Sequence, residues 1–185
     1  IDLVKQNQGI DVKFDEKMND PKVYKLWQNG ESVGIFQFES QGMTNFMKEL
    51  KPDCLEDIIA GVSLYRPGPM DQIPRYIANK KDPEHAVYTH PALKPILEVT
   101  YGCMVYQEQV MQIVRDLAGY SLGRADLVRR AMGKKKLDVM AKEREIFIHG
   151  QTDENGNIVV PGCIRNGIDE QSANKIFDEM AEFAK

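Results

Sequence analysis

Cysteine is scarce in this sequence, and its placement excludes the sites that cysteine pairs usually build. The 185 residues include three cysteines, Cys54, Cys103 and Cys163, which lie far apart. None belongs to a C-x-x-C pair, so the sequence indicates neither a zinc site nor a disulfide framework. We expect reduced, partly buried thiols, as in a cytosolic protein.

Long apolar runs are missing as well. No stretch approaches the roughly 18 apolar residues of a membrane-spanning helix, and the first residues lack the basic and apolar regions of a signal peptide. The expectation is a cytoplasmic protein with no membrane partner. The chain opens without an initiator methionine and closes within a helical pattern that has no stop signal, so we expect a piece of a larger protein.

The sequence also lacks the familiar motifs for nucleotides and catalytic metals. Neither G-x-x-x-x-G-K-[ST] nor G-x-G-x-x-G occurs. No D-x-D pair occurs either, although two-metal phosphoryl transfer needs clustered carboxylates to hold its cations. His85, His90 and His149 show no ligand-like spacing. We predict no catalytic residue, no metal site and no cofactor in this chain.

Helical periodicity is what the sequence has in abundance. Apolar residues recur every three or four positions and strand-like alternation is scarce, which predicts a mainly α fold with short connections, as one domain or two small lobes. Helices are expected to begin at Asp20 with Pro21, at Ser40, and at Asp53 with a capping-box Glu56. The third of these is predicted to bury four apolar side chains: Leu55, Ile58, Ile59 and Val62.

The second half of the chain carries the clearest helical stripe. A helix over residues 105–118 is predicted to bury Tyr106, Val110, Ile113, Val114 and Leu117, and to end at Gly119. Further helices are expected over 122–132, ended by Gly133 in a left-handed conformation, over 138–149 and over 168–185. Asn155-Gly156 beside an apolar run predicts a small β-hairpin, or an ordered loop, near 151–163.

Positive charge is concentrated in one segment of an otherwise acidic chain. The formal net charge is -4, yet residues 124–144 contain eight basic residues against three acidic ones. The centre of this segment is RRAMGKKK, residues 129–136. Arg129 and Arg130 point about 100° apart on a helix and could straddle an anionic group such as phosphate. A solvated basic run at a helix C-terminus explains the same charges about as well.

Four stretches together resemble the alpha subunit of bacterial DNA polymerase III, a family C polymerase. They keep the family's order within residues 34–149, and they are GIFQFESQGM (Gly34 to Met43), LKPDCLEDIIAGVSLYRPGPM (Leu50 to Met70), HPALKPILEVTYGCMVYQEQVMQI (His90 to Ile113) and AGYSLGRADLVRRAMGKKK (Ala118 to Lys136). The resemblance implies that residues 1–185 are a fragment of the polymerase fingers domain. Its parts would be a lead-in from the palm (1–33), a helical core (34–149), a loop or hairpin (150–167) and a truncated helix (168–185).

The resemblance also implies roles for individual basic residues. Arg129 and Arg130 match the paired arginines that contact the triphosphate of the incoming nucleotide in this family, and Lys134, Lys135 and Lys136 match its lysine run. We assign these five to nucleotide binding, and Arg66, in the RPGP turn, together with Arg124 to DNA binding. A purely structural turn at Arg66 remains an equal alternative.

The expected function is that of a part of a DNA-directed DNA polymerase, a nucleotidyltransferase of chromosome replication. By the resemblance, the aspartates that hold Mg²⁺ lie in a palm domain that precedes Ile1, so this chain alone should not catalyse. Its partners would be the incoming dNTP, primer-template DNA, the palm, and the sliding clamp and clamp loader. The alternatives are a non-catalytic nucleic-acid-binding module and a replisome scaffold.

Overall fold

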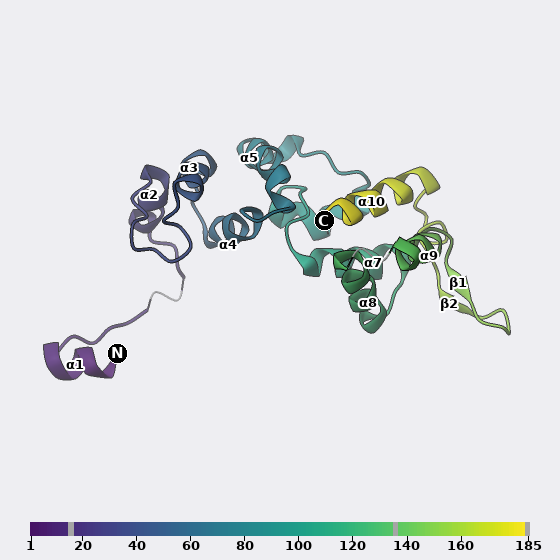
Figure 1. Ribbon diagram of the computed structural model, residues 1–185, viewed down its shortest axis with the longest axis horizontal. Helices are drawn as coiled ribbons and strands as arrows, with labels where there is room; N and C mark the ends of the chain where they lie inside the picture. The colour runs from purple at the N-terminus through teal and green to yellow at the C-terminus, as the bar shows by residue number, and fades with distance from the viewer. Residues whose placement is uncertain (15–16, 135–136, 184–185) are drawn as a thin grey trace. The chain divides into compact units, whose positions relative to one another are not determined.

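The computed structural model of the chain describes residues 1–14, 17–134 and 137–183, and it is mainly α-helical, as predicted (Figure 1). The chain divides into two compact units, Ile1–Ile59 and Ala60–Lys185. The boundary falls inside the stretch 34–149 that the resemblance treats as one helical core. The division also falls within a helix, because α4 spans Leu55–Leu64.

The first unit contains α1 (Asp2–Gln8), α2 (Pro21–Asn29), α3 (Gln41–Leu50) and the start of α4. The predicted caps of α2 and α3 are confirmed, since Asp20 accepts a hydrogen bond from the Lys22 amide and Ser40 from the Met43 amide. The α2 and α3 helices pack together. An apolar stripe of α3 is buried, and its members are Met43, Phe46, Met47 and Leu50.

The predicted start and buried face of α4 are wrong. The helix begins at Leu55 rather than at Asp53, and the amide of Asp53 donates to the carboxylate of Asp57 at 3.1 Å. Asp57 is fully buried, together with Ala60 and Leu64 on the same face, whereas Leu55 and Ile59 are exposed. The spacing of apolar residues identifies a face that can be buried, but it does not specify what covers that face.

The second unit begins with short helical pieces that the sequence analysis did not predict. They are η1 (Pro69–Gln72), α5 (Ile73–Lys81), η2 (Pro83–His85), η3 (Pro91–Leu93), α6 (Lys94–Leu97) and η4 (Glu98–Thr100). Five of these six begin with a proline in their first turn, where the missing amide costs nothing. Such pieces are too short for a periodic apolar stripe to reveal them.

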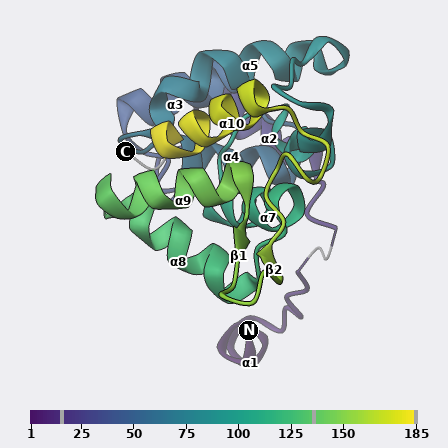
Figure 2. The same cartoon turned by 90° about the vertical axis from the view of Figure 1, so that its right-hand side faces the viewer.

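The main core of the second unit lies among α7 (Gln107–Ala118), α8 (Leu122–Gly133), α9 (Leu137–His149) and α10 (Glu170–Phe183). The first three pack against one another and α10 packs on α9 (Figures 1 and 2). The stripe predicted for α7 is buried from Val110 to Leu117, while Tyr106 precedes the helix and is half-buried. Because α7 and α8 share this core, the start of α7 and the solvent-facing side of α8 have defined positions relative to each other.

The N-terminus of α7 is held by a buried glutamine. Gln109 is 3% exposed, and its side-chain oxygen accepts hydrogen bonds from the amides of Val105 (2.8 Å) and Tyr106 (2.9 Å). Its amide group donates to Thr100 Oγ1 at 2.8 Å and to the Ile96 carbonyl at 3.3 Å. A glutamine at the third helical position commonly caps the amides before a helix. The segment before α7 is thus tied to η4 and α6.

The two glycines predicted to end helices differ in their outcome. Gly119 ends α7 in a left-handed conformation with φ 77°, as expected. Gly133 does not have that role, because it is the last residue of α8, and Lys134 follows as the C-cap with φ -94°. A glycine after an apolar stripe is a common stop signal, but only about a third to a half of helices end in a left-handed residue.

The predicted hairpin is present. Strands β1 (Gln151–Thr152) and β2 (Ile158–Val160) pair antiparallel, and they project from the rest of the second unit in Figure 1. Asp153 organises the tip, since its carboxylate accepts hydrogen bonds from the amides of Asn155 (2.9 Å) and Asn157 (2.8 Å). Gly156 takes φ 82°, the left-handed conformation that an Asn-Gly turn uses.

Candidate phosphate-binding cleft

A cleft of about 540 Å³ lies in the second unit, between four segments of the chain, one of which is the end of α10 at Phe183. The RPGP turn contributes Arg66, the start of α7 contributes Gln107 and Glu108, and the end of α8 contributes Arg129 and Gly133. Two arginines from segments 63 residues apart in sequence therefore line one cavity. The cleft is of the size at which small-molecule sites are usually found.

Arg129 is held in the cleft by two helices. Its Nε and Nη2 donate to Asp126 Oδ1 at 3.0 and 2.7 Å, within α8. Its Nη1 donates to Gln107 Oε1 at 2.8 Å, from α7. The side chain is 27% exposed, so the guanidinium still reaches solvent on the side of the cleft.

Arg130 differs from Arg129 in its surroundings. Its Nη2 pairs with Asp126 Oδ2 at 2.7 Å, and its side chain is 62% exposed. Arg130 does not line the cleft that holds Arg129. The two neighbouring arginines thus share one carboxylate and face different surroundings, as the 100° step between adjacent helical residues requires.

Arg66 stands on a rigid turn, and its guanidinium has no partner among the residues that the structure describes. The backbone of the turn is fixed by hydrogen bonds from the Arg66 amide to the Leu64 carbonyl (2.8 Å) and from the Met70 amide to the Arg66 carbonyl (3.1 Å). Gly68 has φ 97°, which glycine adopts readily, and Pro69 follows it at the start of η1. The structure therefore offers an exposed cation at the cleft.

Two polar residues of the cleft were not singled out as site residues from the sequence. Gln107 orients Arg129, and Glu108 adds an exposed carboxylate beside the arginines. Both belong to the matching stretch HPALKPILEVTYGCMVYQEQVMQI, which was the available signal. Asp126 was counted only as a charge, although it stands three and four residues before Arg129 and Arg130, a spacing that pairs side chains on a helix.

Arg124 lies apart from this cleft and is engaged by other residues of the second unit. Its Nη2 pairs with Glu143 Oε1 at 3.1 Å and its Nη1 donates to Gln151 Oε1 at 2.6 Å. The guanidinium also lies 5.0 Å from the centroid of the Tyr120 ring. The structure thus does not bring Arg124 together with Arg66, and its assignment to DNA stays a prediction.

The lysine run is described only in part. Lys134 is exposed and caps the C-terminus of α8, where a cation interacts favourably with the helix dipole. Lys135 and Lys136, which the sequence assigned to nucleotide binding, lie outside the described residues. Their assignment remains a prediction.

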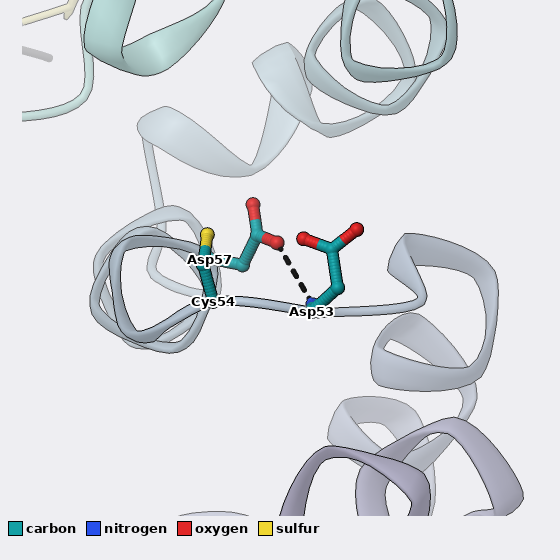
Figure 3. A group of neighbouring side chains, drawn as sticks. All are labelled: Asp53, Cys54 and Asp57. Carbon is teal, nitrogen blue, oxygen red and sulfur yellow. Dashed lines mark hydrogen bonds between the residues drawn. The ribbon is translucent and has the colours of Figure 1, made fainter. Parts of the chain in front are cut away.

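One group of potential metal ligands occurs among the described residues, at the start of α4. Asp53, Cys54 and Asp57 bring a ligand-type atom each within 4.8 Å of one another (Figure 3). Burial raises the pKa of the Cys54 thiol to about 11, so it is protonated at neutral pH. Mg²⁺ prefers an octahedral set of oxygens, and Asp57 already accepts the Asp53 amide. This group does not fit a magnesium site.

The other two cysteines are buried free thiols in the second unit. Burial raises the pKa of Cys103 to about 11 and that of Cys163 to about 12. Thiols with such raised pKa values are weak nucleophiles near neutral pH. No helix among the described residues has the length and apolar character that crossing a membrane requires.

Comparison with known proteins gives consistent matches over most of the chain. The family model of the bacterial DNA polymerase III alpha subunit finger domain matches residues 1–155. The DNA polymerase III subunit alpha of Thermus aquaticus is 47% identical over 188 residues, that of Rickettsia felis 48% over 180, and that of Staphylococcus aureus 44% over 182. These alignments cover 97% to 98% of this chain and 14% to 16% of the relatives.

Proposed function

This chain belongs to the finger domain family of the bacterial DNA polymerase III alpha subunit, and we propose on that premise that its cleft binds the triphosphate of the incoming nucleotide during DNA replication. The whole protein would be a DNA-directed DNA polymerase of the bacterial cytoplasm. The chain spans about a seventh of the length of its relatives, so this activity belongs to a larger assembly of domains.

The observation that carries the proposal is the meeting of Arg66 and Arg129 at one cleft. Guanidinium groups present planar forks of donors that match phosphate oxygens, and two of them on opposite chain segments can contact one polyphosphate together. Each charge-assisted hydrogen bond contributes about 1.5 to 3 kcal/mol. The sequence assigned Arg66 to DNA binding. Because it lines the same cleft as Arg129, we propose the nucleotide as its ligand instead.

The role of these arginines is electrostatic rather than catalytic. Positive charge at the triphosphate stabilises the negative charge that develops on the departing pyrophosphate. Magnesium, when bound by the rest of the polymerase, would polarise the phosphates, and the group of Asp53, Cys54 and Asp57 in this chain does not fit such a site. The chain's own contribution is to bind and orient the triphosphate.

Primer-template DNA, the palm, the sliding clamp and the clamp loader are the partners that follow from this function. Arg130 and Lys134 are exposed at the same end of α8 and are suited to nearby phosphates of the DNA or nucleotide. The basic segment is also compatible with a second function, a non-catalytic nucleic-acid-binding module. The two functions differ in whether the cleft arginines act on the nucleotide or on the DNA.

The test replaces each cleft arginine in the full-length protein that contains this chain. Arg66→Ala and Arg129→Ala are each expected to lower kcat/KM for nucleotide incorporation about 10- to 100-fold, because about 1.4 kcal/mol corresponds to a factor of ten. Loss of a contact that is equally strong in the ground and transition states raises KM, whereas loss of a contact that strengthens as pyrophosphate leaves lowers kcat. Steady-state kinetics on primed DNA, with the melting temperature in parallel, measures both.

Arg165→Ala is the matched control, because Arg165 is exposed in the second unit and does not line the cleft. Its kinetics should equal those of the unmodified protein. Unchanged kinetics in both cleft variants would contradict triphosphate binding. A loss of DNA affinity with an unchanged KM for nucleotide would favour the nucleic-acid-binding module instead.

A further inference from the structure

Asp126 is an acidic residue near the start of the basic segment, residues 124–144, and each of its carboxylate oxygens contacts an arginine. Oδ1 accepts two hydrogen bonds from Arg129, and Oδ2 pairs with Arg130 at 2.7 Å. We propose that Asp126 is a positioning residue, which holds the Arg129 guanidinium in the orientation that receives the triphosphate. The proposal rests on the proposed function of the cleft.

The hydrogen bonds of Arg129 leave a defined set of donors for a ligand. A guanidinium has five N–H groups, one on Nε and two on each terminal nitrogen. Asp126 takes Nε and one N–H of Nη2, and Gln107 takes one N–H of Nη1. One N–H on each terminal nitrogen therefore remains without an acceptor among the described residues, and together they suit two phosphate oxygens.

The anchors of Arg129 come from two different helices. Asp126 belongs to α8, like Arg129 itself, whereas Gln107 belongs to α7 and lines the same cleft. An arginine held at both sides of its planar group has lost its rotamer freedom before the ligand arrives. Binding then costs less conformational entropy than it would with a mobile side chain.

The carboxylate of Asp126 is charged in the state that positions Arg129. The hydrogen bond from Arg129, with a further one from Arg130, holds the pKa of Asp126 below its usual range. At neutral pH the group is thus an acceptor with full negative charge. A protonated or neutral replacement would hold the guanidinium less firmly.

Positioning and simple electrostatics predict opposite signs for the loss of this charge. Removal of a carboxylate makes the basic segment more positive, so a purely electrostatic patch would bind polyphosphate more tightly. If Asp126 positions Arg129, the same change weakens binding, because the guanidinium gains freedom that the ligand must remove. The sign of the effect therefore identifies the role.

The experiment compares Asp126→Asn with Asp138→Asn in the full-length protein that contains this chain. Asp138 is an exposed acid of the same basic segment, on α9, and lines no part of the cleft. Titration calorimetry with inorganic tripolyphosphate is expected to show about three- to tenfold weaker binding for Asp126→Asn. Asp138→Asn should leave affinity unchanged or tighten it slightly. Equal or tighter binding by Asp126→Asn overturns the proposal.

Gln107→Ala provides a second variant that leaves the charge unchanged and alters an exposed side chain. It removes the α7 anchor of Arg129 and should weaken tripolyphosphate binding about two- to fivefold, whereas Gln112→Ala, on the exposed side of α7, should not. A Gln107→Ala affinity equal to that of Gln112→Ala would count against positioning even if Asp126→Asn did not fold.

A double-mutant cycle separates this proposal from the function on which it rests. In an Arg129→Ala background, Asp126→Asn should no longer weaken binding, since no guanidinium is left to position. If Arg129→Ala alone leaves tripolyphosphate affinity unchanged, the proposed function of the cleft fails. If Arg129→Ala weakens binding while Asp126→Asn tightens it, the function stands and the positioning role is wrong.

Discussion

Glu108 gives the cleft a negative charge beside two arginines, and this charge opposes an anionic ligand. Its carboxylate is exposed and has no partner among the described residues. It also stands in the first turn of α7, where an acid interacts favourably with the helix dipole. The residue therefore contributes to the helix while it limits how tightly the cleft holds polyphosphate.

We expect Glu108→Gln to tighten tripolyphosphate binding about two- to tenfold, because a charge of the same sign as the ligand is removed from the lining of the cleft. The gain should shrink as salt is raised, since exposed charges are screened beyond about a Debye length. Titration at two salt concentrations measures both effects. Glu154→Gln, at the tip of the hairpin, is the control and should change nothing. Weaker binding by Glu108→Gln would contradict a repulsive role of this carboxylate toward the ligand.

Arg129 and Arg130 show which features of the candidate site the sequence can predict and which depend on the fold. The matching motif predicted that Arg129 and Arg130 belong to a phosphate site, and it could not distinguish them. The distinction depends on Asp126 and on Gln107, which is 22 residues away in sequence. Arg66 is separated from Arg129 by 63 residues, and only the folded chain brings both to one cleft.

At the scale of elements, helix ends were predicted where a short polar side chain caps them. Ser40 and Asp20 satisfy amides within three residues, so the signal is local and the sequence contains all of it. The cap of α7 is less visible, because Tyr106 stands where serine or threonine usually accompanies a capping glutamine. The buried face of α4 depends on tertiary surroundings, which explains why apolar spacing alone chose the wrong side.

Gln109→Ala is expected to lower the free energy of unfolding by about 3 kcal/mol. The change leaves the amides of Val105 and Tyr106 without their acceptor, and each unsatisfied group costs about 1 to 3 kcal/mol. The Thr100 hydroxyl keeps its hydrogen bond to the Cys103 carbonyl. Urea unfolding followed by circular dichroism measures the loss. Gln112→Ala, exposed on the same helix, should stay within about 0.5 kcal/mol of the unmodified chain. Equal stability of the two variants would mean that water replaces the glutamine.

For the whole molecule, the two compact units have separate sets of buried side chains. The main core cluster lies between Leu93 and Met180, entirely in the second unit, while α2 and α3 bury Tyr24 and the stripe of α3 in the first. Proteins with distinct cores commonly open region by region rather than all at once. A substitution that destabilises one core should therefore increase local opening mainly in the unit that contains it.

Phe177→Ala tests this division. The side chain is 1% exposed and its ring centroid lies 5.7 Å from that of Phe147, so its removal should cost about 3 to 5 kcal/mol. Hydrogen exchange followed by mass spectrometry should show faster exchange in α7 to α10 and unchanged rates in α2 and α3. Leu127→Ala, 65% exposed on α8, is the control. Acceleration of α2 and α3 to the same extent would show one cooperative structure.

The protonated state of the three native thiols gives the molecule an unexpected practical use. Maleimide dyes react with thiolates, and the raised pKa values of Cys54, Cys103 and Cys163 leave little thiolate near neutral pH. A new cysteine in place of Glu154, at the exposed tip of the hairpin, would therefore take up a fluorophore first. This chain, labelled there, could be followed by fluorescence with Cys54, Cys103 and Cys163 left in place.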